Sequence, residues 1–298
     1  MTWDWKKKLN RKIRLADEAL DKYLPAESTM PPTVHKAMRY SVFAGGKRLR
    51  PILVMAAAEA VGGRDEDVLP AACALEMIHT YSLIHDDLPA MDNDDFRRGR
   101  PTNHKVFGEA MAILAGDGLL TAAFEVLAQQ SSAAGIAPGL VLKVIGEVAV
   151  AAGTLGMIGG QVADMEAMNR QVSIELLNYI HTHKTGALCR AAVRSGAILG
   201  GANPGQLEAL TGYAENLGLA FQITDDILDI EGDPAKIGKD VGSDQRNQKA
   251  TFPAIYGLEE SKAMAEQTVS KALQALECFG PEADLLRDIV RYILDRDS

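Results

Sequence analysis

The sequence contains few aromatic residues and few cysteines. Aromatic side chains make up 5% of the 298 residues, and the three cysteines are Cys73, Cys189 and Cys278. They are isolated and odd in number, so they form neither a metal-ligand spacing nor a disulfide framework. We therefore expect a protein of a reducing compartment, the cytoplasm.

Basic residues are also fewer than acidic residues. Lys and Arg number 31 against 40 Asp and Glu, which gives a net charge of -9. This balance argues against a general binder of nucleic acids or of anionic membranes. An anionic substrate would have to be held by local clusters of Lys and Arg, which should stand out in such a sequence.

Long apolar runs are missing as well. The N-terminal residues Met-Thr-Trp-Asp-Trp-Lys-Lys-Lys are not followed by the apolar core of a signal peptide. No run of about 18 apolar residues is free of charge, so we predict no transmembrane helix and no stable insertion into a membrane.

The alternating pattern of β-strands does not recur, whereas Ala, Leu, Ile, Met and Glu, which favour helices, are abundant. Proline and glycine lie mostly between the helical segments. Because no clear linker divides the chain, we predict an all-α protein with one domain over residues 1–298, a single large bundle of about ten or more helices. The expected helices are 3–23, 33–43, 47–61, 66 to the first acidic run, 109–131, 137–168, 173–200, 204–231 and two or three more from Pro253 onward, with 89–108 irregular.

The first acidic run contains Asp86, Asp87, Asp92, Asp94 and Asp95. Like charges at this density repel one another unless a multivalent cation neutralises them, and carboxylates suit Mg2+. In an unbroken helix Asp86 and Asp92 would point apart, since six residues turn the chain by about 600°. Pro89 cannot continue a regular helix, so we expect a kink or bulge there to turn both toward one ion. A solvated acidic helix end is the alternative.

The second acidic run contains Asp225, Asp226 and Asp229. Asp225 and Asp229 are four residues apart, so on a helix their side chains lie on one face, with Gln222 one turn earlier. Two such runs on different helices could face each other across a bundle and hold several cations.

Three basic clusters contrast with the acidic composition. They are Lys47, Arg48 and Arg50; Arg97, Arg98 and Arg100; and Lys239 with Lys249. Arg suits bidentate contact with phosphate and Lys a point contact, so the clusters suggest one or two phosphorylated substrates. The alternative is that each cluster solvates a loop, and for Arg48 or Arg100 alone both readings are equally open.

Two histidines and one lysine lie in apolar helical segments. His79 and His85 can be hydrogen-bonded core residues, while His85-Asp86 also resembles the pair of metal-dependent phosphohydrolases. Lys184, followed by Thr185, is costly to bury unless it meets an anion, which indicates a function.

Five motifs in order resemble those of trans-isoprenyl diphosphate synthases, most closely the bacterial short-chain farnesyl diphosphate synthases and the related geranylgeranyl diphosphate synthases. The motifs are Gly45-Gly46-Lys47-Arg48-Leu49-Arg50-Pro51, Asp86-Asp87-Leu88-Pro89-Ala90-Met91-Asp92 with Arg97-Arg98-Gly99, Lys184-Thr185-Gly186, Phe221-Gln222-Ile223-Thr224-Asp225-Asp226-Ile227-Leu228-Asp229, and Gly238-Lys239-Asp240. The resemblance covers residues 33–257 and implies a helical bundle with a deep central cavity, usually as a homodimer. It implies three Mg2+ ions and head-to-tail condensation of an allylic diphosphate with isopentenyl diphosphate.

The resemblance also implies a role for each matching residue. Asp86 and Asp92 would bind two Mg2+ and Asp225 the third, supported by Asp87, Asp226 and Asp229. The allylic diphosphate would be bound by Arg97, Lys184 and Lys239, and isopentenyl diphosphate by Lys47, Arg50, His79 and Arg98, with Lys249 also a candidate for substrate binding. Thr185 and Gln222 would offer oxygens toward the allylic cation.

Product length would depend on Tyr81, five residues before Asp86, with Ser82 at four. In this family the position of Tyr81 commonly lines the floor of the cavity, and Tyr81 lies about 7.5 Å down the helix from Asp86. A bulky ring there, with the Leu88-Pro89 insertion, favours the fifteen-carbon product. Asn93 matches many geranylgeranyl enzymes instead, and Tyr81 could pack elsewhere in the core.

Other functions remain open at this point. A geranylgeranyl synthase differs only in its product. A terpene cyclase would not need the cluster of Lys47 and Arg50, and a His-Asp phosphohydrolase does not explain the second acidic run. A non-catalytic subunit of a hetero-oligomeric synthase would be expected to lose one of the two acidic motifs, and both are intact.

Overall fold

The computed structural model describes residues 3–134, 136–168, 170, 172–231 and 251–295. It confirms the predicted all-α fold, with a single two-residue hairpin pair as the sheet in these residues. The α-helices are α1 (Trp3–Tyr23), α2 (Pro32–Val42), α3 (Leu49–Ala60), α4 (Asp65–Asp86), α5 (Asn103–Phe107), α6 (Glu109–Ala134), α7 (Pro138–Ala152), α8 (Met157–Ala167), α9 (Ile174–Ile180), α10 (Ala187–Leu199), α11 (Pro204–Glu231), α14 (Phe252–Tyr256), α15 (Leu258–Ala275) and α16 (Asp284–Asp295). A π-helix, η1 (His181–Gly186), and a 3-10 turn, η2 (Pro281–Ala283), complete the helical segments.

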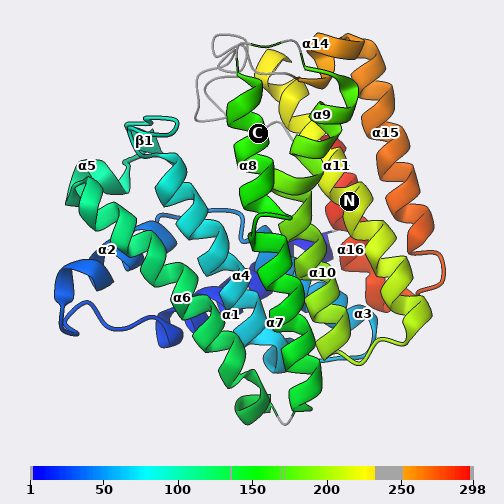
Figure 1. The fold of residues 1–298 in the computed structure, drawn as a ribbon. Helices are drawn as coiled ribbons and strands as arrows, with labels where there is room; N and C mark the ends of the chain where they lie inside the picture. Colours follow the sequence, from blue (N-terminus) through cyan, green and yellow to red (C-terminus); the bar gives the residue numbers. More distant parts are fainter. Residues whose placement is uncertain (1–2, 135, 169, 171, 232–250, 296–298) are drawn as a thin grey trace.

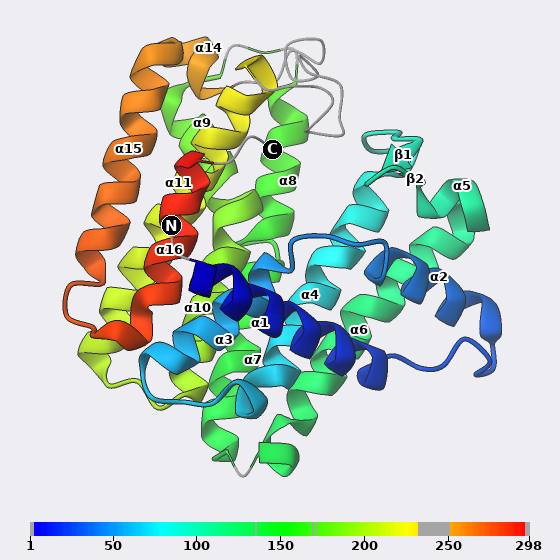
Figure 2. The same cartoon turned by 180° about the vertical axis from the view of Figure 1, so that it is seen from behind.

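The centre of the bundle is formed by α3, α4, α10 and α11 (Figure 1). Helix α4 packs against α6, α3 and α10, and α10 packs against α3, α11 and α7. One cluster of buried apolar side chains extends from α1 to α16. In both views α4 and α11 end toward the same end of the bundle, the upper end, so the two acidic runs lie there (Figures 1 and 2).

Small residues allow the central helices to approach closely. A Cβ atom at Gly196 of α10 would lie 2.0 Å from the carbonyl oxygen of Val54 in α3, and one at Gly160 of α8 would lie 2.1 Å from the backbone nitrogen of Lys184. No side chain fits at either crossing without moving a backbone. The second crossing holds α8 directly against the π-helix that carries Lys184.

The structure corrects three predicted boundaries. The helix expected over 137–168 is two helices, separated at Gly153–Gly156, where two glycines lower the helix propensity. The helix expected over 173–200 contains the π-helical turn, whose different period a sequence pattern does not reveal. The irregular segment 89–108 contains the hairpin of β1 (Phe96–Arg97) and β2 (Arg100–Pro101), followed by α5.

Two segments are long and apolar enough to cross a membrane by length and composition. They are Glu109–Gln130 and Pro138–Ala167, and 39% of each apolar window is buried inside the bundle. Both segments contain charged residues, as expected from the sequence, and the expectation of no transmembrane helix stays a prediction. A core helix of a soluble protein passes the same test, so two such segments are weak evidence for a membrane span.

Candidate active site

The first acidic run folds back on itself. Helix α4 ends at Asp86 rather than kinking, and Pro89 follows two residues after its C-cap, Asp87. The loop then returns, with the backbone N–H of Asp92 donating to the carbonyl oxygen of Asp86 at 2.8 Å. The kink or bulge expected at Pro89 thus takes the form of a helix end and a tight loop, which bring Asp92 beside Asp86.

Asp86 carries an unfavourable charge in this arrangement. Burial raises its pKa from an ordinary value of 3.8 to about 6, and the negative charges of Asp92 and Asp87 add to the rise, while Lys184 and Arg97 oppose it. A nearby cation would favour the ionised form. The electrostatics therefore fit the predicted metal-binding role of Asp86 and Asp92.

Buried Asp87 and half-buried Arg97 form an ion pair. The Arg97 Nε donates to both carboxylate oxygens of Asp87, at 2.7 and 2.9 Å, and its Nη2 lies 2.6 Å from Asp87 Oδ1. The Asp87 carboxylate therefore orients the guanidinium of Arg97. Asp94 and Asp95 are exposed, and Asp95 pairs with Lys105 at 2.7 Å.

The second run lies on the last turns of α11. The Asp226 carboxylate accepts the backbone N–H of Phe252 at 2.9 Å and lies 3.6 Å from His181 Nε2. Asp226 thus holds the start of α14. Asp225 is exposed and Asp229 half-buried, and the charge of Asp225 acts on His181, one turn before Lys184.

Lys184 lies between the two acidic runs. Its Nζ donates to Asp164 of α8 at 2.7 Å, and its charge acts on both Asp86 and His181. Burial lowers the pKa of His181 to about 4, so this histidine is neutral at physiological pH. Lys184 is thus placed where a diphosphate shared by the two runs would meet it.

Sequence reasoning missed Gln161 and Asp164. They are three residues apart on α8, and the Oε1 atom of Gln161 is buried without a hydrogen-bond partner in the described part of the chain. Polar residues at this helical spacing in the mostly apolar helix Met157–Ala167 were the signal available.

The cationic end of the site contains His79, Arg50 and Arg98. Burial lowers the pKa of His79 well below its usual range, and the charges of Arg50, Arg98 and Arg97 lower it further. The pKa of Arg98 is lowered by burial and by its arginine neighbours, although Glu76 opposes this. The Nε atom of Arg50 is buried and lacks a hydrogen-bond partner among the described residues. A bound anion would relieve this crowding of like charges.

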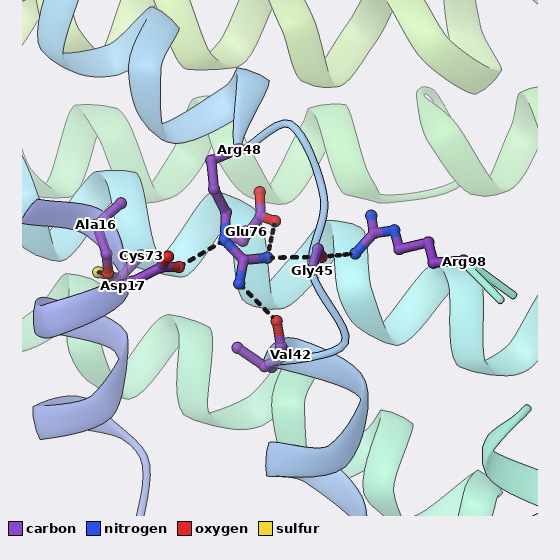
Figure 3. A network of polar contacts seen from close by, with 8 residues as sticks. All are labelled: Ala16, Asp17, Val42, Gly45, Arg48, Cys73, Glu76 and Arg98. Carbon is purple, nitrogen blue, oxygen red and sulfur yellow. Dashed lines mark hydrogen bonds and ion pairs between the residues drawn. The ribbon is translucent and has the colours of Figure 1, made fainter. Parts of the chain in front are cut away.

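Arg48 does not belong to this cationic surface. Sequence proximity groups it with Lys47 and Arg50, but its guanidinium points into the protein and pairs with Asp17 and Glu76 (Figure 3). The sequence left two interpretations open for Arg48, solvation of a loop and contact with a phosphate. The structure supports neither of them. Lys47 is exposed at the same loop.

A cavity of about 420 Å3 opens below Asp86 between α4, α8 and the π-helix. It confirms the expected cavity inside the bundle. Its lining residues are Arg50, His79, Tyr81, Ser82, Leu83, His85, Asp86, Met91, Met157, Ile158, Gln161, Val162, Met165, Lys184 and Thr185. The walls far from the charged groups are thus mostly apolar. Gln222 is half-buried on α11, and the predicted residues Lys239 and Lys249 lie outside the described residues.

Comparison with known proteins agrees with this arrangement. The family model described as Polyprenyl synthetase matches residues 31–287. The chain belongs to this family. It is 49% identical over 289 residues to a farnesyl diphosphate synthase of Geobacillus stearothermophilus, covering 97% of both chains. It is 47% identical over 291 residues to a geranylgeranyl diphosphate synthase of Cyanophora paradoxa, covering 97% of this chain and 96% of the relative.

A solved structure supports the same assignment. The crystal structure of an FPP/GFPP synthase from Zymomonas mobilis superposes with a TM-score of 0.88 at 38% identity, covering 99% of this chain and all of that one. The predicted resemblance to bacterial farnesyl diphosphate synthases is confirmed, and relatives named for two product lengths are equally similar.

The carboxylates of the first acidic run fit a metal ion whose coordination a bound substrate completes. Among the described residues, no group of three or more His, Cys, Asp or Glu side chains could hold an ion unaided. Mg2+ commonly takes one or two carboxylates and completes its coordination with water and substrate phosphates. Asp86 and Asp92 match that requirement.

The raised pKa of Asp86 predicts a stability cost in the metal-free protein. Because the pKa rises from 3.8 to about 6, the cost is small below pH 3.8, grows between 3.8 and about 6 and is complete above that. The variant Asp86→Asn should be more stable than wild type by about 1–3 kcal/mol at pH 8 in EDTA, and this gain should vanish at pH 4. Urea unfolding at both pH values measures it.

Asp95→Asn is the matched control, since Asp95 belongs to the same run but is exposed and paired with Lys105. It should show no such gain at pH 8. An Asp86→Asn difference that stays the same at pH 4 and pH 8 would contradict the interpretation.

Proposed function

We propose that the protein is a short-chain prenyltransferase that condenses isopentenyl diphosphate with dimethylallyl and geranyl diphosphate, giving farnesyl diphosphate and free diphosphate. The observation that carries the proposal is the placement of two aspartate runs and Lys184 at one end of the bundle, above an apolar cavity. Its relatives include synthases named for farnesyl and for geranylgeranyl diphosphate, so the twenty-carbon product is the alternative.

Magnesium would be held by Asp86, Asp92 and Asp225, with three ions expected when diphosphate is bound. Bound Mg2+ would neutralise the charge of the leaving diphosphate as a Lewis acid. Asp87 and Asp226 would support these ligands indirectly, since their carboxylates hold Arg97 and the start of α14. Asp229 would complete the second run.

The cationic side chains would divide between two substrates. Arg97, Lys184 and Lys239 would bind the allylic diphosphate, and Lys47, Arg50, His79 and Arg98 would bind isopentenyl diphosphate. The low pKa of His79 keeps its imidazole neutral, so it would act as a hydrogen-bonding group rather than as a cation. Lys249 would be a further contact to substrate.

The reaction breaks the bond between the allylic carbon and its diphosphate, and isopentenyl diphosphate then attacks the allylic cation and loses a proton. The apolar cavity walls would exclude water. The oxygens of Thr185 and Gln222 would stabilise the allylic cation, whereas a carboxylate in their place would trap it. Within the described site no side chain is evidently placed as a base. The released diphosphate would therefore accept the proton.

Loss of one aspartate ligand should abolish condensation while leaving the fold. Asp86→Ala is expected to lower turnover by at least about 10²-fold, and EDTA should do the same to wild type, reversed by Mg2+. Radiolabelled isopentenyl diphosphate with geranyl diphosphate measures the rate. Asp95→Asn is the matched control and should retain activity, and substantial turnover in Asp86→Ala would contradict the proposal.

Tyr81 is proposed to set product length from the cavity wall. Its side chain is 6% exposed, lines the cavity and packs edge-to-face against His85, with ring centroids 5.7 Å apart. Ser82 lines the same wall one turn before Asp86. A ring at this depth would stop a growing chain, which supports the fifteen-carbon product.

Tyr81→Ala should lengthen the product toward twenty carbons or more, because it removes the ring from the path of the chain. Chromatography of the dephosphorylated products measures chain length. Ser82→Ala, which removes only a hydroxyl at the neighbouring position, should leave the distribution unchanged. The same products from Tyr81→Ala as from wild type would show that the ring is not the barrier.

A homodimer is proposed from the apolar surface of α6 and α7. Ile113 and Leu114 of α6 and Leu142 and Val150 of α7 are exposed, with Leu142 at 68%. Both helices lie on the same face of the bundle (Figure 1). Large apolar side chains exposed on neighbouring helices can mark an interface between copies.

Sedimentation should give twice the mass of one chain, and Leu142→Glu should shift the protein toward the monomer because it places a charge in the interface. A replacement on another surface, Glu259→Lys on α15, is the control and should remain dimeric. A wild-type monomer at micromolar concentration would contradict the proposed dimer.

A further inference from the structure

The side chain of Arg48 lies behind the loop that carries Lys47. This loop leads directly into the helix that carries Arg50. We propose that Arg48, held by Glu76 and Asp17, is a positioning residue for isopentenyl diphosphate: it fixes the backbone of residues 43–48 and so the placement of Lys47 and Arg50. The inference rests on the proposed function, because it concerns how the second substrate of that reaction is held.

The guanidinium of Arg48 is enclosed by acceptors from three elements. Its Nε donates to Asp17 Oδ1 of α1 at 2.7 Å, and its Nη1 donates to Glu76 Oε1 of α4 at 2.9 Å. Its Nη2 donates to the carbonyl oxygen of Val42, the last residue of α2, at 2.7 Å. Arg48 is 4% exposed and Glu76 is 2% exposed. The side chain therefore ties α1, α2 and α4 together and does not reach a ligand.

The backbone of Arg48 explains why a side-chain anchor is needed. Its φ is +50°, in the left-handed region that is unfavourable for residues other than glycine. Arg48 is also the N-cap of α3, so this backbone turn directs Lys47 outward and starts the helix on which Arg50 is the second residue. Without its ion pairs the turn would lose the contacts that compensate for its strain.

The opposite side of the loop is covered by Arg98. Its Nη1 donates to the carbonyl oxygen of Gly45, and the same oxygen lies 3.4 Å from Arg48 Nη1. Figure 3 shows Gly45 between the two guanidinium groups. At Gly46 a Cβ atom would lie 2.6 Å from the guanidinium carbon of Arg98. The loop is thus clamped between one buried and one substrate-facing arginine.

The charges around the loop distinguish Arg48, which positions the loop, from Arg50 and Arg98, which would bind the substrate. Arg48 is neutralised inside the protein by Asp17 and Glu76, which raise its pKa although burial opposes them. No ion pair among the described residues joins Arg50 or Arg98 to a carboxylate. Arg50 and Arg98 thus remain available for the anion, while Arg48 holds the loop from which they act.

Asp17→Asn and Glu76→Gln test the inference by weakening the anchor without touching the cavity. Each should raise KM for isopentenyl diphosphate roughly tenfold, while KM for geranyl diphosphate stays within about twofold and kcat changes little. Arg48→Lys, which keeps the charge but loses the planar fork, should give the same split. Asp21→Asn is the matched control, since Asp21 lies one turn later on α1 and pairs with Arg39 instead.

Equal changes in both KM values, or unchanged KM for isopentenyl diphosphate in a folded variant, would overturn the inference. Asp17 is partly exposed, so Asp17→Asn decides the question if Glu76→Gln fails to fold. Calorimetric titration of isopentenyl diphosphate separates this inference from the proposed function. Weaker binding to Asp17→Asn than to wild type supports the anchor even if no condensation occurs, equal binding overturns it, and no binding to wild type overturns both.

Discussion

Buried charges of like sign lie close together at one end of the bundle, and the proposed chemistry rests on how they are neutralised. Asp86 and Asp92 are brought together by a backbone hydrogen bond, and burial with neighbouring carboxylates raises the pKa of Asp86 to about 6. Nearby, Arg50 and Arg98 crowd around a neutral His79. Among the described residues, no carboxylate forms an ion pair with Arg50 or Arg98, and burial disfavours the charge of Asp86. A cation and an anionic diphosphate would satisfy both at once, which is the physical basis of the proposed chemistry.

Several charged residues next to these groups are paired within the protein. Asp87 holds Arg97, Asp226 holds the start of α14, and Glu76 with Asp17 holds Arg48. A buried ion pair is strongly destabilised when one partner is lost, because the other charge stays buried. Such pairs therefore suit the fixing of loops beside a site that binds charged ligands.

The breaks in the helices occur next to this site. The π-helical turn carries Lys184 and Thr185, the separation of α7 from α8 places Gln161 and Asp164 beside them, and the end of α4 creates the return to Asp92. Gly160 permits the contact between α8 and the π-helix, since a Cβ atom would lie 2.1 Å from the Lys184 nitrogen. Regular helices build the apolar cavity, and local departures from them carry its polar groups.

The helical class, most helix limits and the two acidic runs could be predicted from the sequence, because helix propensity, glycine and proline placement and charge spacing act over a few residues. It also indicated Lys184 and Tyr81 as site residues, through a buried charge in an apolar segment and through family resemblance. Which neighbours in sequence share a role became clear in the folded structure: Arg48 turns inward between Lys47 and Arg50, and Asp87 turns to Arg97 beside Asp86. Asp164 meets Lys184 across two elements, 20 residues apart in the chain. Such pairings depend on packing between distant segments, which local patterns do not contain.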